Sequence, residues 1–154
     1  MPETHWLTED EERAWRSLQF MQMQISAGLA RDLASSTDLT YPEYLVLVGL
    51  TDSATGRLRL YELGDILGWE KSRLSHQVAR MAARGLLARD ACSDDRRGCF
   101  VVLTDEGREA IVAAAPVHLA SVRRLFFDHL TTAEAVALGV LCATVLEQVS
   151  TATP

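Results

Sequence analysis

The sequence predicts a mainly α-helical protein that carries one small β-hairpin. Residues 60–104 follow the order helix, tight turn, second helix and hairpin, and the hairpin has a charged tip. Long amphipathic runs, with apolar residues at three- and four-residue steps, lie on both sides of this stretch. Together these observations predict a winged helix-turn-helix with N- and C-terminal dimerisation helices.

The first helix is predicted over residues 8–33. Thr8 and Glu11 have the spacing of a capping box, in which each side chain accepts a hydrogen bond from the other residue's backbone. A second such pair, Thr40 with Glu43, opens a helix that continues through Leu50, and a loop and a short strand, residues 57–60, follow.

Two helices with a tight turn between them form the middle of the chain, over residues 61–67 and 70–84. Gly68 is expected to make the turn because glycine tolerates a positive φ, and Gly85 ends the second helix. Strands 86–92 and 99–103 then form the hairpin.

Two further helices are predicted after the hairpin. Thr104 caps the first, which is expected to run to about His129, with a kink or break between Val112 and Pro116 because proline cannot donate the helical hydrogen bond. Thr131 and Glu134 cap the second. Its apolar face is formed by Val136, Leu138, Leu141, Val145 and Val149.

The overall composition bounds the class of protein. The length of 154 residues suits one domain, and no window approaches 18 uninterrupted apolar residues, so no membrane-spanning helix is expected. The acidic N-terminus lacks the pattern of a signal peptide, which predicts a cytoplasmic location. The four histidines are scattered and the common catalytic motifs are missing, so neither an enzyme nor a metal or cofactor site is expected.

The charge is distributed unevenly. The formal net charge is −6, which by itself disfavours a nucleic-acid partner. Residues 57–104, however, hold nine basic and six acidic residues, a net of +3, whereas the rest holds six basic and fifteen acidic residues, a net of −9. A basic unit within an acidic body fits one surface that faces DNA.

The predicted helix 70–84 has two faces. Leu74, Val78 and Met81 recur at i, i+4 and i+7 and are expected to pack inward. The other face is polar and is formed by Ser72, Arg73, Ser75, His76, Gln77 and Arg80. Arg73 and Gln77 suit bidentate contacts to base edges in a major groove. Phosphate contacts near the helix N-terminus are expected from Lys71, Ser72 and Ser75. An ordinary solvated face is the alternative.

The hairpin tip contains Asp95, Arg96 and Arg97 directly after this helix. Arg97 could enter a minor groove, and Asp95 could hold an arginine in that pose through a charge-assisted pair. A polar turn is the alternative, because Asp and Gly are common turn residues. Two DNA-suited surfaces at this spacing favour DNA binding more strongly than either alone.

The same stretch carries a family resemblance. Glu62-Leu63 with Leu67-Gly68, the run 84–89 after the second helix, and Asp95-Arg96-Arg97 ahead of residues 103–108 resemble the MarR family of bacterial regulators. The resemblance extends over residues 8–149 and implies a single MarR-type domain, residues 1–154. Within it, residues 40–104 would form the DNA-binding region, and residues 8–33 and 105–150 the dimerisation helices.

The resemblance implies a transcriptional regulator, most often a repressor, that binds double-stranded DNA as a homodimer on a palindromic operator. The recognition helices would then lie roughly 34 Å apart. Family members often release DNA when a small aromatic molecule binds. The residues expected to contact such an effector mix aromatic and polar character and are Trp15, Gln19, Tyr44, His118 and Arg123. Packing or interface roles are the alternative for each.

Two other functions remain open at this stage. The first is a winged-helix module that binds proteins and has lost DNA binding. The second is a redox switch that uses Cys92 and Cys99, which flank the predicted hairpin tip. Oxidant-sensing members of the family carry a reactive cysteine near the start of the first helix, and this chain has none there, which argues against sensing of that type.

Overall fold

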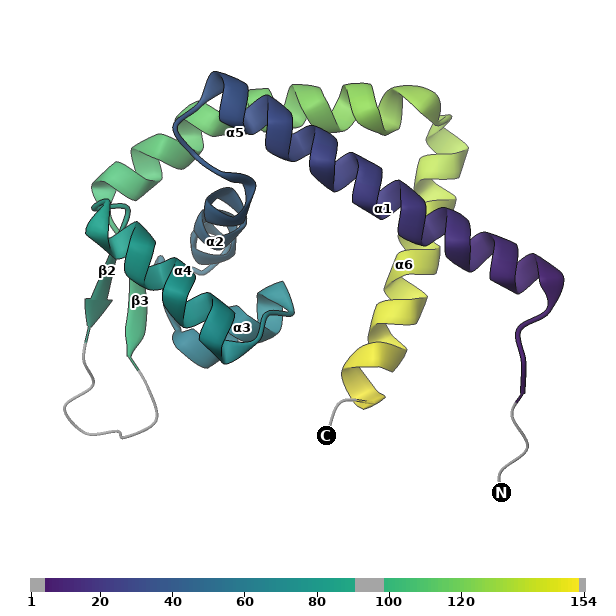
Figure 1. Cartoon of the computed structure of the whole chain (residues 1–154), viewed down its shortest axis with the longest axis horizontal. Helices are drawn as coiled ribbons and strands as arrows, with labels where there is room; N and C mark the ends of the chain where they lie inside the picture. Colours follow the sequence, from purple (N-terminus) through teal and green to yellow (C-terminus); the bar gives the residue numbers. More distant parts are fainter. Residues whose placement is uncertain (1–4, 91–98, 153–154) are drawn as a thin grey trace. The chain divides into compact units, whose positions relative to one another are not determined.

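The computed structural model describes residues 5–90 and 99–152. Its elements in chain order are α1 (Glu9–Ser36), α2 (Tyr41–Thr51), β1 (Arg57–Arg59), α3 (Leu60–Leu67), α4 (Lys71–Ala83), β2 (Leu87–Asp90), β3 (Phe100–Leu103), α5 (Asp105–Leu125), a 3-10 turn η1 (Phe127–His129) and α6 (Thr132–Ala152) (Figure 1). The predicted class, mainly helical with a small sheet, is confirmed. The chain forms two compact units, one of residues 29–118 and the other of residues 1–28 and 119–154.

The helix starts follow from short-range hydrogen bonds. At α1, the Thr8 backbone N–H donates to the Glu11 carboxylate at 2.7 Å, and the Glu11 N–H donates back to the Thr8 hydroxyl at 3.3 Å. The same reciprocal pair opens α2 between Thr40 and Glu43. A third precedes α6, between Thr131 and Glu134. The predicted capping box at Thr8 and the predicted caps at Thr40 and Thr131 are confirmed.

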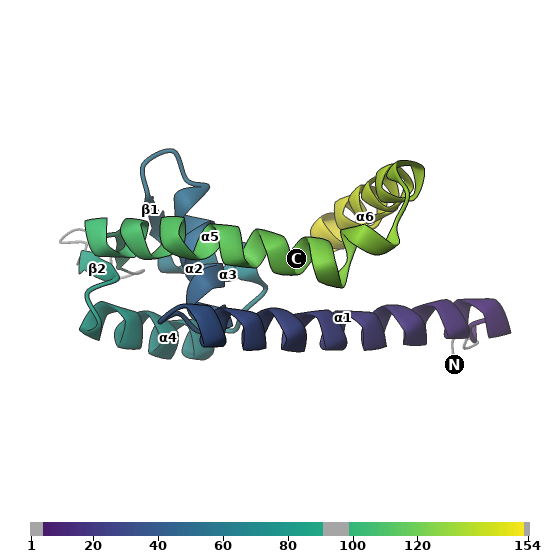
Figure 2. The same ribbon diagram turned by 90° about the horizontal axis from the view of Figure 1, so that it is seen from above.

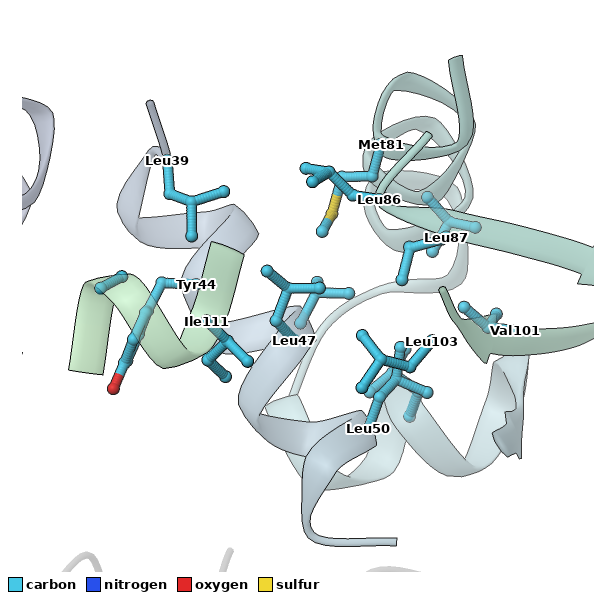
Figure 3. Packing of buried hydrophobic residues seen from close by; sticks show 14 of the residues in the cluster. Leu39, Tyr44, Leu47, Leu50, Met81, Leu86, Leu87, Val101, Leu103 and Ile111 are labelled. Carbon is cyan, nitrogen blue, oxygen red and sulfur yellow. The ribbon is translucent and has the colours of Figure 1, made fainter. Parts of the chain in front are cut away.

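One hydrophobic core holds the unit of residues 29–118 together. Side chains from α2, α3, α4, the sheet and the first turns of α5 meet there (Figure 3). Leu47, Leu63 and Leu74 are completely buried. The sheet is antiparallel with the strand order β1-β3-β2. This core fixes α4 against α3 and the hairpin strands, so the exposed face of α4 is carried on a rigid support.

The turn between α3 and α4 depends on Gly68, which adopts φ +62° and ψ +34°. In that conformation the Trp69 N–H donates to the Gly64 carbonyl at 3.0 Å and closes the helix end. The left-handed region disfavours residues with a Cβ, so glycine here sets the angle between the two helices.

Two boundaries differ from expectation. Leu60 is the first residue of α3 and not the last of β1. Of the kink or break predicted between Val112 and Pro116, the break is wrong, because α5 is one continuous helix from Asp105 to Leu125 (Figure 2). The kink stays a prediction. The helix ends at Leu125, before the predicted end at about His129, and the turn Phe127–His129 follows it. Pro116 is exposed, and its missing N–H removes a single hydrogen bond while neighbouring turns keep theirs.

Candidate nucleic-acid interface

Helix α4 presents one apolar and one polar face, as predicted. Leu74, Val78 and Met81 are completely buried against the core. On the opposite face Ser75 is half-buried, and the exposed side chains are Lys71, Ser72, Arg73, His76 and Arg80. Donors and acceptors of several kinds are therefore available to a partner along one side of the helix.

Gln77 is an exception, and its expected position on the exposed face is wrong. Its side chain is only 5% exposed, and its Oε1 accepts a hydrogen bond from Nη2 of Arg80. Gln77 follows Leu74 by three residues and precedes Met81 by four, so it lies on the stripe that packs inward. Its polarity, and not its helical position, had suggested the outer face. Gln77 thus holds Arg80 from beneath the surface.

Arg73 is held in place by the turn before α4. Its guanidinium carbon lies 4.1 Å from the centre of the Trp69 ring, a cation-π stack. Stacking covers the planar face of a guanidinium and leaves the N–H groups free along its edge. Arg73, which is exposed, therefore presents a preset fork of donors at the first turn of α4.

The far end of α4 is tied to α2 by Arg84. Its Nη1 lies 2.6 Å from a Glu43 carboxylate oxygen, and its Nη2 donates to the Asp38 carbonyl at 2.8 Å. Burial alone would raise the pKa of Glu43, but hydrogen bonds from Thr40 and Arg84 outweigh it and hold that pKa below its usual value. Sequence reasoning missed this pair because the residues are 41 positions apart; only the capping role of Glu43 was readable locally.

The predicted wing tip, with Asp95, Arg96 and Arg97, lies outside the described residues, as does Cys92. Its two supporting strands are described and pair in the register Leu87 with Leu103 through Asp90 with Phe100. Cys99 is half-buried and accepts a hydrogen bond at Sγ from Nη2 of Arg89 at 3.6 Å. The described residues therefore do not test the hypothesis of a redox switch that uses Cys92 and Cys99.

Of the predicted effector contacts, the structure brings Tyr44 and His118 together. Their ring centroids lie 4.4 Å apart, and Tyr41, which sequence reasoning missed, stacks on His118 with 6.2 Å between the ring centroids. Nδ1 of His118 is buried and has no hydrogen-bond partner among the described residues. Burial lowers the pKa of His118 and raises those of Tyr41 and Tyr44.

The other three predicted effector contacts belong to the second unit. Trp15 and Gln19 are exposed on α1. Arg123 is exposed on α5, with Nε 3.7 Å from the Asp128 carboxylate. Their role as effector contacts stays a prediction.

Known proteins similar to this chain show which family it belongs to. Residues 37–98 match the profile of the MarR family. The transcriptional regulator HosA of Escherichia coli is 31% identical over 105 residues, which cover 68% of this chain and 74% of HosA. The chain belongs to the MarR family. It is a winged-helix transcriptional regulator, and the fold and function that the resemblance implied are confirmed at this level.

Two solved structures from Streptomyces coelicolor are similar over nearly the whole chain. AbsC, a MarR family transcriptional regulator, is 38% identical, with a TM-score of 0.84 over 96% of this chain and 99% of AbsC. Sco3205, another MarR family regulator, was solved in complex with DNA; it is 37% identical, with a TM-score of 0.86 over 96% of this chain and 92% of Sco3205.

Proposed function

We propose that this MarR family regulator binds duplex DNA through the polar face of α4 and acts as a repressor. The observation that carries the proposal is the stack of Arg73 on Trp69, with 4.1 Å between the guanidinium carbon and the ring centre. The inner face of α4, the helix that carries Arg73, is fully buried. A preset arginine fork on a rigid helix suits the paired acceptors of a guanine edge. Arg73 would read bases, and Lys71, Ser72 and Ser75 would contact phosphates.

The remaining polar residues have supporting roles in this proposal. His76 and Arg80 extend the interface along α4, and Gln77 acts indirectly by holding Arg80. Asp95, Arg96 and Arg97 are proposed to form the wing that enters the adjacent minor groove. The rival function, a protein-binding module, gives no reason for a stacked arginine at the start of α4.

The regulator is proposed to work as a homodimer. Among the described residues of the unit formed by residues 1–28 and 119–154, only Gly28 and Ser121 are buried. Large apolar side chains on its helices are instead exposed, including Phe20, Val136, Leu141 and Val145. Apolar surface of this extent marks an interaction site, and a second copy of the chain is the simplest cover. Residues 8–33 and 105–150 would then form the dimerisation helices of a single domain.

We infer a cytoplasmic location and no enzymatic activity. The stretches Asp105–His129 and Thr132–Val149 are long and apolar enough to cross a membrane by length and composition alone. A helix that packs against a second protein chain can have the same length and apolar composition. Because the chain belongs to a family of transcriptional regulators, we infer that these two stretches are apolar for that reason.

Release from DNA by a small aromatic effector is also proposed. Tyr44 and His118 are the residues that support it, because two aromatic rings in contact and a buried, unsatisfied nitrogen among the described residues offer both stacking and a polar anchor. Trp15, Gln19 and Arg123 stay predicted contacts.

A footprint on the intergenic DNA beside the protein's own gene tests the proposal. We expect protection of a palindrome that covers two successive major grooves, and loss of that protection with Arg73→Ala. Arg13→Ala is the matched control, because Arg13 lies on α1 with its side chain 65% exposed. Uniform protection without a defined site, in wild type and variant alike, would rule out sequence-specific binding.

A further inference from the structure

The first turn of α2 contacts both α4 and α5. Tyr41 and Tyr44 are three positions apart and share one face of the helix, where their ring centroids lie 6.2 and 4.4 Å from that of His118 on α5. From another side of the same turn, a Glu43 carboxylate oxygen lies 2.6 Å from Nη1 of Arg84, the residue that caps the end of α4. One helical turn therefore touches both the proposed effector contacts and the proposed recognition helix.

Glu43 is the only charged residue that is buried in the described part of the chain. Its Oε2 accepts hydrogen bonds from the backbone N–H and the hydroxyl of Thr40, at 2.8 and 3.0 Å, which fix the side chain to the start of α2. Its Oε1 accepts a hydrogen bond from Arg84. One oxygen is thus committed to its own helix and the other to α4. Because a buried carboxylate that loses its cation is costly, a displacement of this turn should carry Arg84 with it.

Arg84 connects this carboxylate to the polar face of α4. Its backbone N–H donates to the carbonyls of Arg80 and Met81, so its backbone is held by the last turn of the helix. Arg80, four positions earlier, is exposed on the polar face. The second arm of the Arg84 guanidinium donates to the Asp38 carbonyl at 2.8 Å. A shift at Glu43 would therefore reach a proposed DNA contact within one helical turn.

We propose that Glu43 couples the ring cluster of Tyr41, Tyr44 and His118 to DNA binding by α4, through its ion pair with Arg84. This inference rests on the proposed DNA binding and on the proposed effector contacts, and it gives the effector a physical connection to the recognition helix. A molecule that separates His118 from the tyrosine rings displaces the first turn of α2, and the ion pair passes that displacement to α4. Glu43 is a positioning residue, because it acts on DNA only through Arg84.

Glu43→Gln distinguishes this role from a purely electrostatic one. The substitution keeps a side chain that can cap α2, since Gln serves in a capping box as Glu does, but it removes the charge that holds Arg84. Loss of a negative charge by itself strengthens binding to DNA, which is an anion. The coupling predicts the opposite, with binding to the duplex upstream of the protein's own gene weakened about fivefold or more. Glu109→Gln, the same charge change at an exposed position of α5, is the matched control and should not weaken binding.

A double-mutant cycle with His118→Ala measures the coupling itself. His118→Ala removes one ring from the cluster and should weaken DNA binding about fivefold or more when Glu43 is present. In the Glu43→Gln background it should have little further effect, because the connection to α4 is already lost. Tyr41→Ala, which removes a half-buried ring of the same cluster, takes the place of His118→Ala if that variant unfolds. Fluorescence anisotropy measures each affinity under conditions in which denaturant unfolding shows the variant to be folded.

The outcomes separate the coupling from the proposed DNA binding. If wild-type protein binds the upstream duplex and the effects of Glu43→Gln and His118→Ala multiply, the coupling is wrong while the proposed DNA binding stands. The coupling is also wrong if either folded single variant binds as tightly as wild type, or if Glu109→Gln weakens binding as much as Glu43→Gln. If wild-type protein binds neither the upstream duplex nor a random one, the proposed DNA binding falls and the coupling falls with it.

Discussion

The Arg73 guanidinium stacks on the Trp69 ring, with 4.1 Å between the guanidinium carbon and the ring centre. Trp69 in turn packs against the hydrophobic core and follows the left-handed Gly68. The direction of Arg73 is therefore set by the same turn that sets the direction of α4. Little rotamer freedom remains to be lost when a partner binds, which favours affinity.

This stack predicts how DNA discrimination responds to substitution. Arg73→Ala should reduce the preference for operator over random duplex by about 1–3 kcal/mol. Trp69→Leu should also reduce this preference, but by less, because the arginine remains and only its support is lost. Fluorescence anisotropy with both duplexes measures the preference, and Arg13→Ala is the control. Equal preference in wild type and Arg73→Ala would mean that Arg73 does not read bases.

The Glu43–Arg84 ion pair predicts a dependence of stability on pH. Glu43→Gln keeps the shape of the capping side chain and removes the charge that faces Arg84. It should lower the free energy of unfolding at pH 7 by about 1.5–2 kcal/mol, the lower part of the range for hydrogen bonds to charged groups, because Arg84 is half exposed. Denaturant unfolding measures the difference.

The sign of the pH effect follows from the lowered pKa of Glu43. A carboxyl group whose pKa is lower in the folded state stabilises the fold above its unfolded pKa, about 4.3, and that contribution is lost as the pH falls through the folded value. The gap between wild type and Glu43→Gln should therefore close in strong acid. A gap that stays constant down to pH 2 would show that the charge of Glu43 is not the cause.

Replacing Gly107 with a residue that carries a Cβ should cause a severe packing defect. A Cβ at this position would overlap the carbonyl oxygen of Leu86 and lie 2.9 Å from Cδ1 of Leu103. The first turn of α5 can sit against the sheet only without that atom. Gly107→Ala should destabilise the protein by about 3 kcal/mol, the upper end for an overpacked core. Glu109→Ala, on an exposed position of the same helix, is the control, and equal unfolding midpoints for the two variants would contradict this packing account.

The exposed apolar side chains of α6 predict the oligomeric state. Leu141 and Val145 are 64% and 60% exposed in the single chain. Leu141→Glu with Val145→Glu would bury two unpaired charges in the proposed interface, so the dimer should dissociate at micromolar concentration. Analytical ultracentrifugation measures this, with Glu147→Gln as the control. A double variant that sediments as wild type would place the interface elsewhere.

Local signals in the sequence were sufficient for much of the fold. The capping boxes at Thr8, Thr40 and Thr131 and the glycine at 68 each act within four residues, so their patterns are readable without tertiary structure. Gln77 was misplaced because polarity was given more weight than helical position. The pair Glu43–Arg84 joins residues 41 positions apart, and no local pattern encodes such a contact.

The polar face of α4 is proposed to read a defined DNA sequence. A salt-titrated shift assay decides whether it does, with the DNA upstream of the protein's own gene competing against random duplex at physiological salt. The upstream duplex should bind on the order of 10³-fold more tightly or better, and this preference should fall with Arg73→Ala. Equal affinity for both duplexes would contradict it.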